Sequence, residues 1–584
     1  MAVYMYTMIR FLIVLFSLFS ISAVFMPHYP SSHNDYPQDY FRSPVDHDIK
    51  LSGTFGELRP NHFHAGIDIK SKTGKIGQNL YAVADGVVSR INIKSSGYGN
   101  AIYIDHPNGY TSVYAHLDKF PKEIADYMFQ QQYEKQISEI ESYPSADRFH
   151  FKKGDIIGTL GLSGRSYGPH LHFEIRDTES EVPINPLLFG FEINDKVRPD
   201  LRAIKLYGLD GQLKELESKQ FTLRQVGSSY TPRKDTIEMN TYDVGIAMKA
   251  YDQMTGVSNL NGIYALEMYV DDSLHFSFTM DKISFDQTRY INAHMDYIER
   301  ETKKSYFNRC FKLPGNELSI YENENWDGVI KINEDKAKKI HYVVTDLHQN
   351  KSESTFWVKK SNSAEDFDGK PYQYLLYYNQ DNEISRKDIN FFMPKGALYR
   401  DLEFQFLTSE ESSHNIHSHV YHLHDPMTPL HKNFSLAIQP KTDLRALRGK
   451  AFIGYCGTDN QYFNCGGTWE GNMLTTKTSL LGDYCIMIDT IPPSITPVKF
   501  RSKLNGYTSI RFKIEDNVKV GKGGEGLSYK GYIDDQWILM TYNGKNETVT
   551  YKVDDRLQAG QHTFKLIVRD ALGNSTTYQK PISL

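Results

Sequence analysis

Short apolar stretches alternate with polar positions through residues 51–175, and glycine-containing turns separate them. Examples are residues 79–88 (NLYAVADGVV), 101–104 (AIYI) and 111–114 (TSVY), with an Asn108-Gly109 turn before the last of these. A period of two is typical of strands that bury one face, and Asn-Gly favours tight hairpins. The pattern predicts a compact antiparallel β-sheet domain.

One segment of this region has a different period. Residues 124–142 (IADYMFQQQYEKQISEIES) place charged and apolar side chains at helical spacing and contain neither Gly nor Pro. Such a pattern favours an amphipathic helix. We therefore expect a helical insertion between two strands of the sheet.

Longer strand-like runs follow Pro186, and some of them recur near the C-terminus. Strands that repeat in this order are typical of tandem β-sandwich modules, here of immunoglobulin-like type. A further strand-rich module is expected between the two copies, and Pro492-Pro493 marks the hinge into the last one. The matching runs are residues 245–252 (GIAMKAYD), 264–272 (YALEMYVDD) and 340–346 (IHYVVTD) with 509–516 (SIRFKIED), 529–535 (YKGYIDD) and 563–570 (TFKLIVRD).

The N-terminus carries an export signal in this interpretation. Arg10 precedes the uncharged run 11–26, which is shorter than the roughly 18 residues that span a membrane. We expect an exported protein of the periplasm or cell envelope, with an uncleaved anchor as the alternative. The predicted organisation is a signal peptide at 1–26, a linker at 27–46, the β-sheet domain at 47–195, β-sandwich modules at 200–362 and 365–488, and an immunoglobulin-like module at 491–584.

Composition supports a mainly β, multidomain chain and excludes one class of partner. The 584 residues include 40 Tyr, 32 Phe and 41 Gly, which favours strands and turns. A net charge of -5 gives no polycationic surface, so nucleic acid is not expected as a partner. Of the four cysteines, Cys456 is expected to pair with Cys465 or Cys485, with free buried thiols as the alternative.

Candidate chemistry gathers in three stretches of the first domain: residues 61–68 (NHFHAGID), 114–117 (YAHL) and 164–174 (GRSYGPHLHFE). A zinc hydrolase needs three His or carboxylate ligands and one open position. In an extended strand His64 and Asp68 would lie about 13 Å apart, so the chain must bend if they share an ion. Gly66 permits that bend.

The triplet His170-Leu171-His172 follows the geometry of a strand. Residues two apart point to the same face, so one imidazole can bind a metal while the other faces a substrate. Glu174 continues this face and can accept the second N–H of a ligand histidine.

These motifs resemble those of the LytM/lysostaphin family of zinc metalloendopeptidases (peptidase family M23). The neighbouring 84–86 (ADG) and 97–100 (GYGN) match as well, so the resemblance extends over the predicted β-sheet domain. It implies a β-sheet enzyme that hydrolyses peptide bonds in bacterial peptidoglycan. It also implies that His64, Asp68 and His172 hold Zn²⁺, while His116 and His170 flank the metal-bound water, one accepting its proton and both stabilising the oxyanion.

Two other functions remain open at this point. The chain can be a non-catalytic or partner-gated regulator of other cell-wall hydrolases, with the helical insertion covering the cleft. It can also be a wall-binding or adhesion protein in which the sandwich modules dominate. Peptidoglycan is the expected partner in each case, and the modules can contact a second envelope protein. Cross-links are favoured over glycine bridges as the bond that is cut.

Other histidines have different expectations. His62 is expected at the rim or in a structural role, and His106 in a solvated turn. A histidine-rich stretch is interpreted as a polar strand face, with a second metal site as the alternative; its members are His414, His417, His419, His422, His424 and His431.

Overall fold

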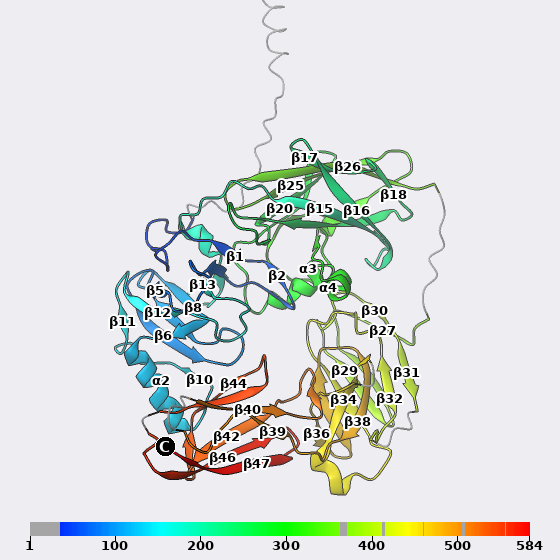
Figure 1. Ribbon diagram of the computed structural model, residues 1–584. Coiled ribbons are helices and arrows are strands. Elements are labelled where there is room, and N and C mark those ends of the chain that lie inside the picture. Colours follow the sequence, from blue (N-terminus) through cyan, green and yellow to red (C-terminus); the bar gives the residue numbers. More distant parts are fainter. Residues whose placement is uncertain (1–34, 363–370, 411–414, 459–460, 505–508, 555) are drawn as a thin grey trace, which may run out of the picture.

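The computed structural model describes residues 35–362, 371–410, 415–458, 461–504, 509–554 and 556–584. The predicted signal peptide and His414 lie outside the described residues. The chain is mainly β, as predicted, and the described part forms four β-rich units with separate cores. These units follow one another around a ring, so that the last lies beside the first (Figure 1). No helix of the described residues is long and apolar enough to cross a membrane.

The first unit, residues 35–195, is built on antiparallel strands. Its strands are β1 (Leu51–Gly53), β2 (Leu58–Arg59), β3 (His62–Phe63), β4 (Ile67–Lys70), β5 (Asn79–Tyr81), β6 (Gly86–Ile93), β7 (Ala101–Asp105), β8 (Tyr110–Ala115), β9 (Leu117–Lys119), β10 (Ile140–Ser142), β11 (His150–Phe151), β12 (Ile156–Leu160), β13 (His170–Asp177) and β14 (Pro183–Ile184), followed by the 3-10 helix η2 (Pro186–Phe189). The main sheet has the order β1-β4-β13-β8-β7-β6-β10, with β11 beside β6 and β14 beside β13. A smaller sheet has the order β5-β12-β9, and β2 pairs with β3.

The predicted helical insertion holds one helix and one strand. The helix α2 (Lys122–Lys135) buries Ile124 and Met128 in the core of the first unit. It ends at Gln136, whose left-handed backbone (φ 51°) turns the chain away. Residues 140–142 then form β10 beside β6. The helix prediction is therefore wrong for these last residues, where burial alternates as in a strand.

The predicted linker, residues 27–46, packs against the first unit over its described part. Phe41 and Val45 lie in the core, and the Arg42 N–H donates to the Val83 carbonyl oxygen at 2.9 Å. Burying such side chains removes apolar surface from water and orders the segment. Residues 35–46 are thus an arm of the first unit and not a free linker.

The second unit, residues 200–362, is a sandwich whose halves share a long strand. Its elements are β15 (Asp200–Leu209), β16 (Glu215–Val226), β17 (Ser229–Pro232), β18 (Thr236–Met239), β19 (Asp243–Tyr251), β20 (Ala265–Val270), β21 (Ser273–Thr279), η3 (Thr288–Tyr290), α3 (Ile291–His294), α4 (Tyr297–Lys303), β22 (Asn308–Arg309), β23 (Tyr321–Glu324), η4 (Asn325–Gly328), β24 (Ile330–Lys331), β25 (Lys338–Thr345) and β26 (Lys351–Lys360). The order is β22-β19-β15-β16-β17-β26-β25-β20-β21-β23, so β16 joins the two halves. Phe55 and Phe63 of the first unit lie in this core, while Met254 and Leu347 lie in the core of the first unit.

The third and fourth units are two-sheet sandwiches. Their strands are β27 (Tyr374–Leu376), β28 (Asn382–Arg386), β29 (Ile389–Met393), β30 (Leu402–Phe404), β31 (Phe406–Ser409), β32 (Val420–Leu423), β33 (Phe434–Ile438), β34 (Ala451–Cys456), β35 (Tyr462–Asn464), β36 (Thr468–Glu470), β37 (Met473–Thr478) and β38 (Gly482–Ile488), with the 3-10 helix η5 (Arg445–Lys450), and then β39 (Ser494–Lys499), β40 (Ser509–Glu515), β41 (Lys519–Val520), β42 (Ser528–Ile533), β43 (Gln536–Ile538), β44 (Met540–Asn543), β45 (Thr548–Lys552), β46 (Gln561–Arg569) and β47 (Ser575–Ser583). In the fourth unit the sheets β39-β40-β45-β44 and β43-β42-β46-β47 face each other. In the third, β28-β29-β33-β37-β36 faces β31-β32-β38-β34-β35, to which β41 of the fourth unit adds a parallel strand.

The third unit does not contain the predicted disulfide. No disulfide bond joins any of the four cysteines, and Cys456 Sγ lies 3.7 Å from Cys485 Sγ across β34 and β38. The described histidines of the histidine-rich stretch do not gather at one point, and those that form contacts have different partners. His419 pairs with Glu410, His422 pairs with Asp483, and His431 stacks on Tyr290. None of them belongs to a metal-like grouping in the described part of the chain.

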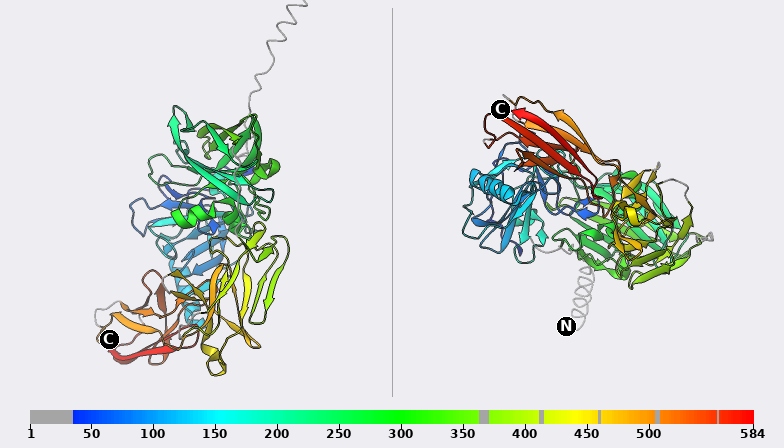
Figure 2. Two further views of the ribbon diagram at one scale, coloured as in Figure 1. Left: turned by 90° about the vertical axis from the view of Figure 1, so that its right-hand side faces the viewer. Right: turned by 90° about the horizontal axis from the view of Figure 1, so that it is seen from below.

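The fourth unit lies against the first at α2 and at a loop that precedes β13. The Tyr133 ring packs edge-on against Trp537, with ring centres 5.1 Å apart, and Arg556 covers the same tyrosine. Lys545, in the turn between β44 and β45, donates its Nζ to the Ser166 carbonyl oxygen. The view from below in Figure 2 shows this unit beside α2.

Candidate metal centre and active site

Strand register brings two predicted ligands together on one face of the main sheet. On β13 the apolar residues Leu171, Phe173 and Ile175 point into the core, so His172 and the other even-numbered residues point to the opposite face. His172 lies directly across from Asp68 on β4. The short alternation of apolar and polar residues in each strand is the local reason for this placement.

His64 reaches the same point because the chain bends after β3. Its Nδ1 lies 2.7 Å from the Thr54 carbonyl oxygen, and its own carbonyl oxygen accepts from the Gly56 N–H at 2.9 Å. Gly66 is needed at the bend for a different reason from the predicted one. Its φ is not in the left-handed region; instead, a Cβ there would clash with the Phe173 carbonyl oxygen, because the bent segment runs directly against β13.

The three predicted metal ligands converge within hydrogen-bond distance of one another. His64 Nε2 lies 2.9 Å from His172 Nδ1 and 3.1 Å from Asp68 Oδ1, and His172 Nδ1 lies 3.0 Å from Asp68 Oδ1. All three side chains are buried. Ligand atoms of a tetrahedral zinc site are about 3.3 Å apart, given bonds of about 2.0 Å. The cluster therefore has the size of a metal site.

Hydrogen bonds fix which ring nitrogens are free. A carbonyl or carboxylate oxygen only accepts, so His64 must carry its proton on Nδ1, facing Thr54. His172 Nε2 likewise donates to Glu174 Oε1 at 2.7 Å, which is the hydrogen bond expected from the sequence. The lone pairs of His64 Nε2 and His172 Nδ1 and an oxygen of Asp68 consequently face one another. Three acceptors at this separation repel unless a proton on His172 or a metal cation lies between them, so the donor set fits a metal ion that replaces this proton.

The pKa values follow the same logic. Burial lowers the pKa of His64 to about 4. Burial also opposes charge on His172, but hydrogen bonds to Asp68 and Glu174 raise its pKa to about 9. The pKa of Asp68, despite burial, is held well below its usual range by the attraction of His64 and hydrogen bonds from the neighbouring histidines. A proton on His172 and a metal ion thus compete for one position.

A buried network behind His172 was not predicted beyond Glu174. Tyr98 OH donates to Glu174 Oε1 at 2.6 Å, and Arg176 Nε donates to Glu174 Oε2 at 2.7 Å. These contacts and burial together leave the pKa of Glu174 at about 2, so it stays an acceptor. The Gly-Tyr-Gly-Asn motif contained Tyr98 and was a usable signal, whereas Arg176 only continues the polar face of β13.

His116 lies at the junction of β8 and β9 with a left-handed backbone (φ 62°). Such a conformation is strained for a residue other than glycine and persists where neighbours fix it. Here the His116 N–H donates to the Tyr98 carbonyl oxygen at 2.9 Å, and Nδ1 lies 2.9 Å from the Ser163 carbonyl oxygen. Gly99 and Gly164 touch so closely that a Cβ on either would clash with the other loop.

His170 completes the group of five predicted residues. Its ring centre lies 4.9 Å from that of His116, and its Nε2 lies 3.5 Å from Asp68 Oδ1. Its Nδ1 donates to the Gly168 carbonyl oxygen at 2.8 Å, which leaves Nε2 toward the metal ligands. Burial and the two neighbouring histidines lower the pKa of His116 to about 3. Both histidines thus direct Nε2 toward the cluster.

Two other histidines lie outside this group. His62 is exposed, with Nδ1 against the Pro60 carbonyl oxygen. The expectation that His106 is solvated is wrong: it is buried, with Nδ1 2.8 Å from the Asp85 carbonyl oxygen and Nε2 2.7 Å from Ser112 Oγ. The turn that contains His106 folds back onto the sheet, which periodicity alone does not reveal.

A charged pair next to Asp68 was also missed. Arg59 Nη2 donates to Asp68 Oδ2 at 2.6 Å and lies 3.7 Å from Glu57 Oε2. Arg59 and Glu57 lie in and beside β2, in the segment that leads to His64. This contact orients Asp68 so that Oδ1 faces the histidines.

The antiparallel sheet thus presents two buried histidines and an aspartate, with two further histidines beside them, as a candidate metal centre. Comparison with known proteins finds that residues 62–133 match the model of peptidase family M23 and residues 373–489 match that of a Zu5-like domain. The first match includes His64, Asp68 and His116. The resemblance predicted from the motifs is confirmed for this part of the chain.

Relatives match the same region. The DD-carboxypeptidase/endopeptidase Mpg of Neisseria meningitidis serogroup B is 34% identical over 159 residues, which are 26% of this chain and 30% of the relative. The murein hydrolase activator NlpD of Escherichia coli is 34% identical over 140 residues, 24% of this chain and 29% of the relative. The solved catalytic domain of lysostaphin from Staphylococcus simulans is 24% identical, covers 27% of this chain and 93% of that one, and has a TM-score of 0.17. This chain spans about a third of the length of the curated relatives.

Proposed function

We propose that the protein is an exported zinc metalloendopeptidase that hydrolyses peptide cross-links in bacterial peptidoglycan. The observation that carries the proposal is the convergence of lone pairs from His64, Asp68 and His172, with His116 and His170 beside them. Two nitrogens and one carboxylate are a usual ligand set for catalytic zinc, which keeps its fourth position open. Zinc, when bound, would lower the pKa of a water molecule toward about 7 and polarise the scissile carbonyl.

The two flanking histidines supply the proton transfers. His116 is neutral at physiological pH because burial lowers its pKa, and its Nδ1 is held by Ser163, so Nε2 accepts the proton of the attacking water. The protonated ring then donates to the leaving amine. His170, held through Gly168, faces the same space from β13 and is positioned beside the carbonyl oxygen on which negative charge develops.

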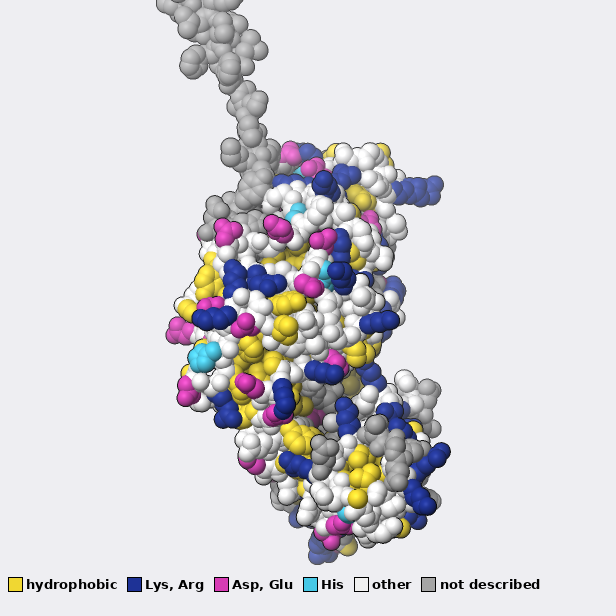
Figure 3. Space-filling model, turned by 60° about the vertical axis from the view of Figure 1, so that its left-hand side comes forward, with side chains coloured by type: hydrophobic (Ala, Val, Ile, Leu, Met, Phe, Trp, Pro, Cys, Tyr) yellow, Lys and Arg dark blue, Asp and Glu magenta, His cyan; other side chains and the backbone are white. Residues whose placement is uncertain are grey.

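Peptidoglycan as the substrate is supported by the names of the relatives. A DD-carboxypeptidase/endopeptidase and a murein hydrolase activator match this region. On the face shown in Figure 3, Lys and Arg side chains are interspersed with Asp and Glu, so this face has no continuous basic patch of the kind that binds a polyanion. We further propose export by the N-terminal signal; cell fractionation and N-terminal sequencing of the mature protein test this.

The test of the enzyme is release of soluble muropeptides from purified, cross-linked sacculi. The mature protein with zinc is expected to release them, and mass analysis identifies the bond. Loss of one flanking histidine, in His170→Ala, is expected to lower the rate by about 10²–10⁴-fold while zinc binding is retained. His62→Ala is the matched control, because His62 is exposed and outside the group of five. Release that is equal in His170→Ala and the control contradicts the proposal.

A partner-gated form of this enzyme is the second candidate, and the position of the fourth unit favours it. The insertion helix α2 packs on the core and carries the contacts with Trp537 and Arg556, while Lys545 reaches Ser166 four residues before His170. The proposed gate is therefore the fourth unit and not the helix predicted from the sequence. A partner that binds the fourth unit would withdraw Lys545 from the loop.

The gate predicts activation by a distant substitution. Tyr133→Ala removes the ring that packs on Trp537, so the fourth unit is expected to dissociate and muropeptide release to rise several-fold. Tyr143→Ala is the control, because Tyr143 is exposed and contacts Glu141 and Arg90 of its own unit. An unchanged rate in Tyr133→Ala would remove the support for gating. A wild-type protein that binds zinc, releases nothing and stimulates another wall hydrolase would instead identify a non-catalytic regulator.

A further inference from the structure

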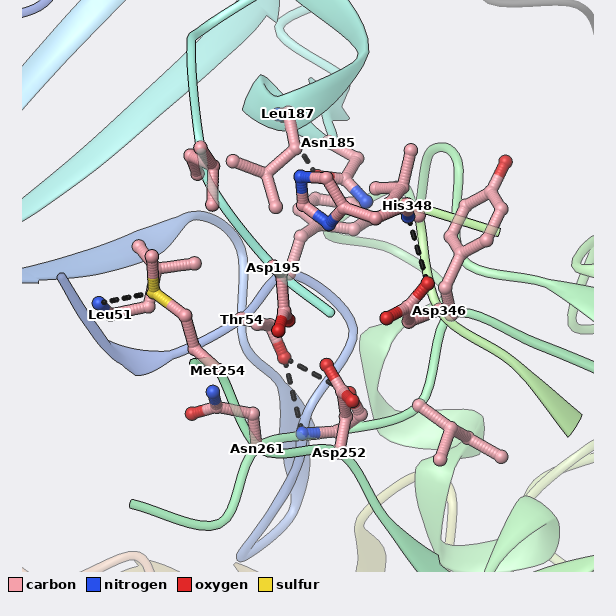
Figure 4. Close-up of a pocket in the computed structure, with 16 residues that line it drawn as sticks. Leu51, Thr54, Asn185, Leu187, Asp195, Asp252, Met254, Asn261, Asp346 and His348 are labelled. Carbon is pink, nitrogen blue, oxygen red and sulfur yellow. Dashed lines mark hydrogen bonds between the residues drawn. The ribbon is translucent and has the colours of Figure 1, made fainter. Parts of the chain in front are cut away.

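A small cavity lies between the first and second units, away from the histidine cluster. Its volume is about 30 Å³, which is enough for one or two water-sized guests. Three aspartates line it: Asp195 in the connection between the units, Asp252 directly after β19 and Asp346 directly after β25. Thr54, which follows β1, closes the cavity from the side of the first unit. Figure 4 shows the three carboxylates converging from three separate segments.

The carboxylates are close together, and among the described residues no Lys or Arg pairs with them. Ligand atoms of Asp195, Asp346 and His348 all lie within 4.8 Å of one another. Asp252 and Asp346 are 7% and 3% exposed. None of the three aspartates forms an ion pair with a described Lys or Arg, in contrast to most buried acidic groups. Like charges in this setting are costly unless something neutralises them.

Two buried side chains in the cavity have polar atoms with no hydrogen-bond partner. These atoms are Asp252 Oδ1 and both the oxygen and the nitrogen of the Asn261 side-chain amide. Asn261 is only 1% exposed, and its backbone is fixed by two hydrogen bonds with Asp252 at 2.8 and 3.0 Å. Buried polar atoms nearly always have a partner, so atoms of this kind that face a cavity indicate a missing ligand.

The other aspartates are held in place by the backbone. Asp195 Oδ1 accepts from the Thr255 N–H and hydroxyl, both at 3.0 Å. Asp346 Oδ1 accepts from the N–H groups of His348 and Asn350, both at 2.8 Å, and Oδ2 accepts from Asn350 Nδ2 at 2.7 Å. The cavity is therefore lined by carboxylates whose orientations are fixed before any ligand arrives.

The same construction recurs at the entrance to the fourth unit. Asp489 follows the preceding unit, Asp516 directly follows β40 and Asp570 directly follows β46, with ligand atoms within 4.8 Å of one another. Asp570 accepts from Asn574 through the backbone N–H at 2.8 Å and the side-chain amide at 2.7 Å, matching Asp346 with Asn350. Asp516 Oδ1 also has no hydrogen-bond partner. An arrangement built twice at module entrances is not an accident of one loop.

We propose that Asp195, Asp252 and Asp346, with the amide oxygen of Asn261, bind one calcium ion that joins the first and second units. Calcium takes six to eight oxygen ligands at about 2.3–2.6 Å, so ligands on opposite sides of one ion are up to about 5 Å apart. The ligand atoms of Asp195 and Asp346, which lie within 4.8 Å of each other, fit this limit, and Asp252 and Asn261 line the same cavity. Carboxylate and amide oxygens are hard ligands that favour calcium over zinc, so the site is chemically distinct from the histidine cluster.

Thr54 connects the cavity that would hold the ion with the histidine cluster. The Thr54 hydroxyl exchanges hydrogen bonds with Gly262 on the cavity side, at 3.1 and 3.3 Å. Its carbonyl oxygen accepts from His64 Nδ1. Burial and the charges of Asp346 and Asp195 raise the pKa of Asp252 to about 8 in the absence of an ion, as expected for an uncompensated cluster.

The test is calcium binding by the full mature chain, with zinc held constant. Titration calorimetry is expected to show that Asp252→Asn binds one calcium ion fewer per chain than wild type, or binds at this site at least tenfold more weakly. Asp286→Asn is the control, because Asp286 is an exposed aspartate of the same unit and belongs to neither carboxylate group. Equal calcium stoichiometry and affinity in wild type and Asp252→Asn would overturn the proposal, as would binding of Mn²⁺ or Zn²⁺ at the site without Ca²⁺.

Thermal unfolding separates a calcium site from a merely structural aspartate. In calcium-free buffer Asp252→Asn is expected to unfold at the same or a higher temperature than wild type, because it removes a buried carboxyl group that faces two other aspartates. Added calcium is expected to raise the unfolding temperature of wild type and Asp286→Asn more than that of Asp252→Asn. A variant that is less stable than wild type without calcium, and gains as much from it, contradicts the proposal.

Discussion

At the scale of single residues, the chemistry depends on which nitrogen of each histidine is occupied. His64, His116 and His170 each direct Nδ1 to a backbone carbonyl oxygen, whereas His172 directs Nε2 to Glu174. The free nitrogens therefore all face one point. Reversal of any one tautomer would place an N–H against the metal position.

The pKa of His172 predicts how metal affinity depends on pH. Its pKa of about 9 lies above the usual 6.5, so the metal-free protein binds a proton at this ring throughout the neutral range. Because that proton must leave before a metal binds, zinc affinity is expected to rise about tenfold per pH unit from pH 7 to 9. Competition with a chelator of known affinity measures this, with His62→Ala as the control. An affinity that is constant above pH 6.5 would show that the ring is not protonated.

At the scale of elements, the site depends on the close approach of β13 and the bent segment 64–66. Gly66→Ala is expected to destabilise the protein by about 1–3 kcal/mol, because the added Cβ clashes with the Phe173 carbonyl oxygen and the strands must separate. Urea unfolding and zinc affinity should both report the change. Gly211→Ala is the control, since a Cβ there has open space. Equal effects of the two substitutions would contradict the packing argument.

At the scale of the whole molecule, the ring of units closes through the contact between α2 and the fourth unit. Tyr133→Ala is expected to open the ring, because ring packing with Trp537 and Arg556 is lost. Small-angle X-ray scattering should then show a larger radius of gyration, and proteolysis near Pro492-Pro493 should accelerate. Tyr143→Ala is expected to scatter like wild type. A compact Tyr133→Ala variant would mean that other contacts, such as Ser138 with Tyr529, hold the units together.

Local structure and the candidate residues follow from short-range patterns in the sequence. Alternation of apolar and polar residues predicted the mainly β fold, and in β13 it also determined that His170, His172 and Glu174 share a face. The joint spacing of three histidine-containing motifs selected His64, Asp68, His116, His170 and His172 and indicated the M23 family. These features are local, because strand period and motif spacing depend only on residues that are close together in the sequence.

The way in which distant segments meet became known from the fold. The register that sets Asp68 against His172 joins residues 104 apart in sequence, and it depends on how whole strands pack. The same holds for Thr54 beside His64, for the arm at residues 35–46, for Lys545 beside Ser166 and for the aspartates between the first two units. Each of these contacts depends on the burial and charge of groups that are far apart in the chain. A local sequence pattern therefore does not predict which distant residue will be the partner.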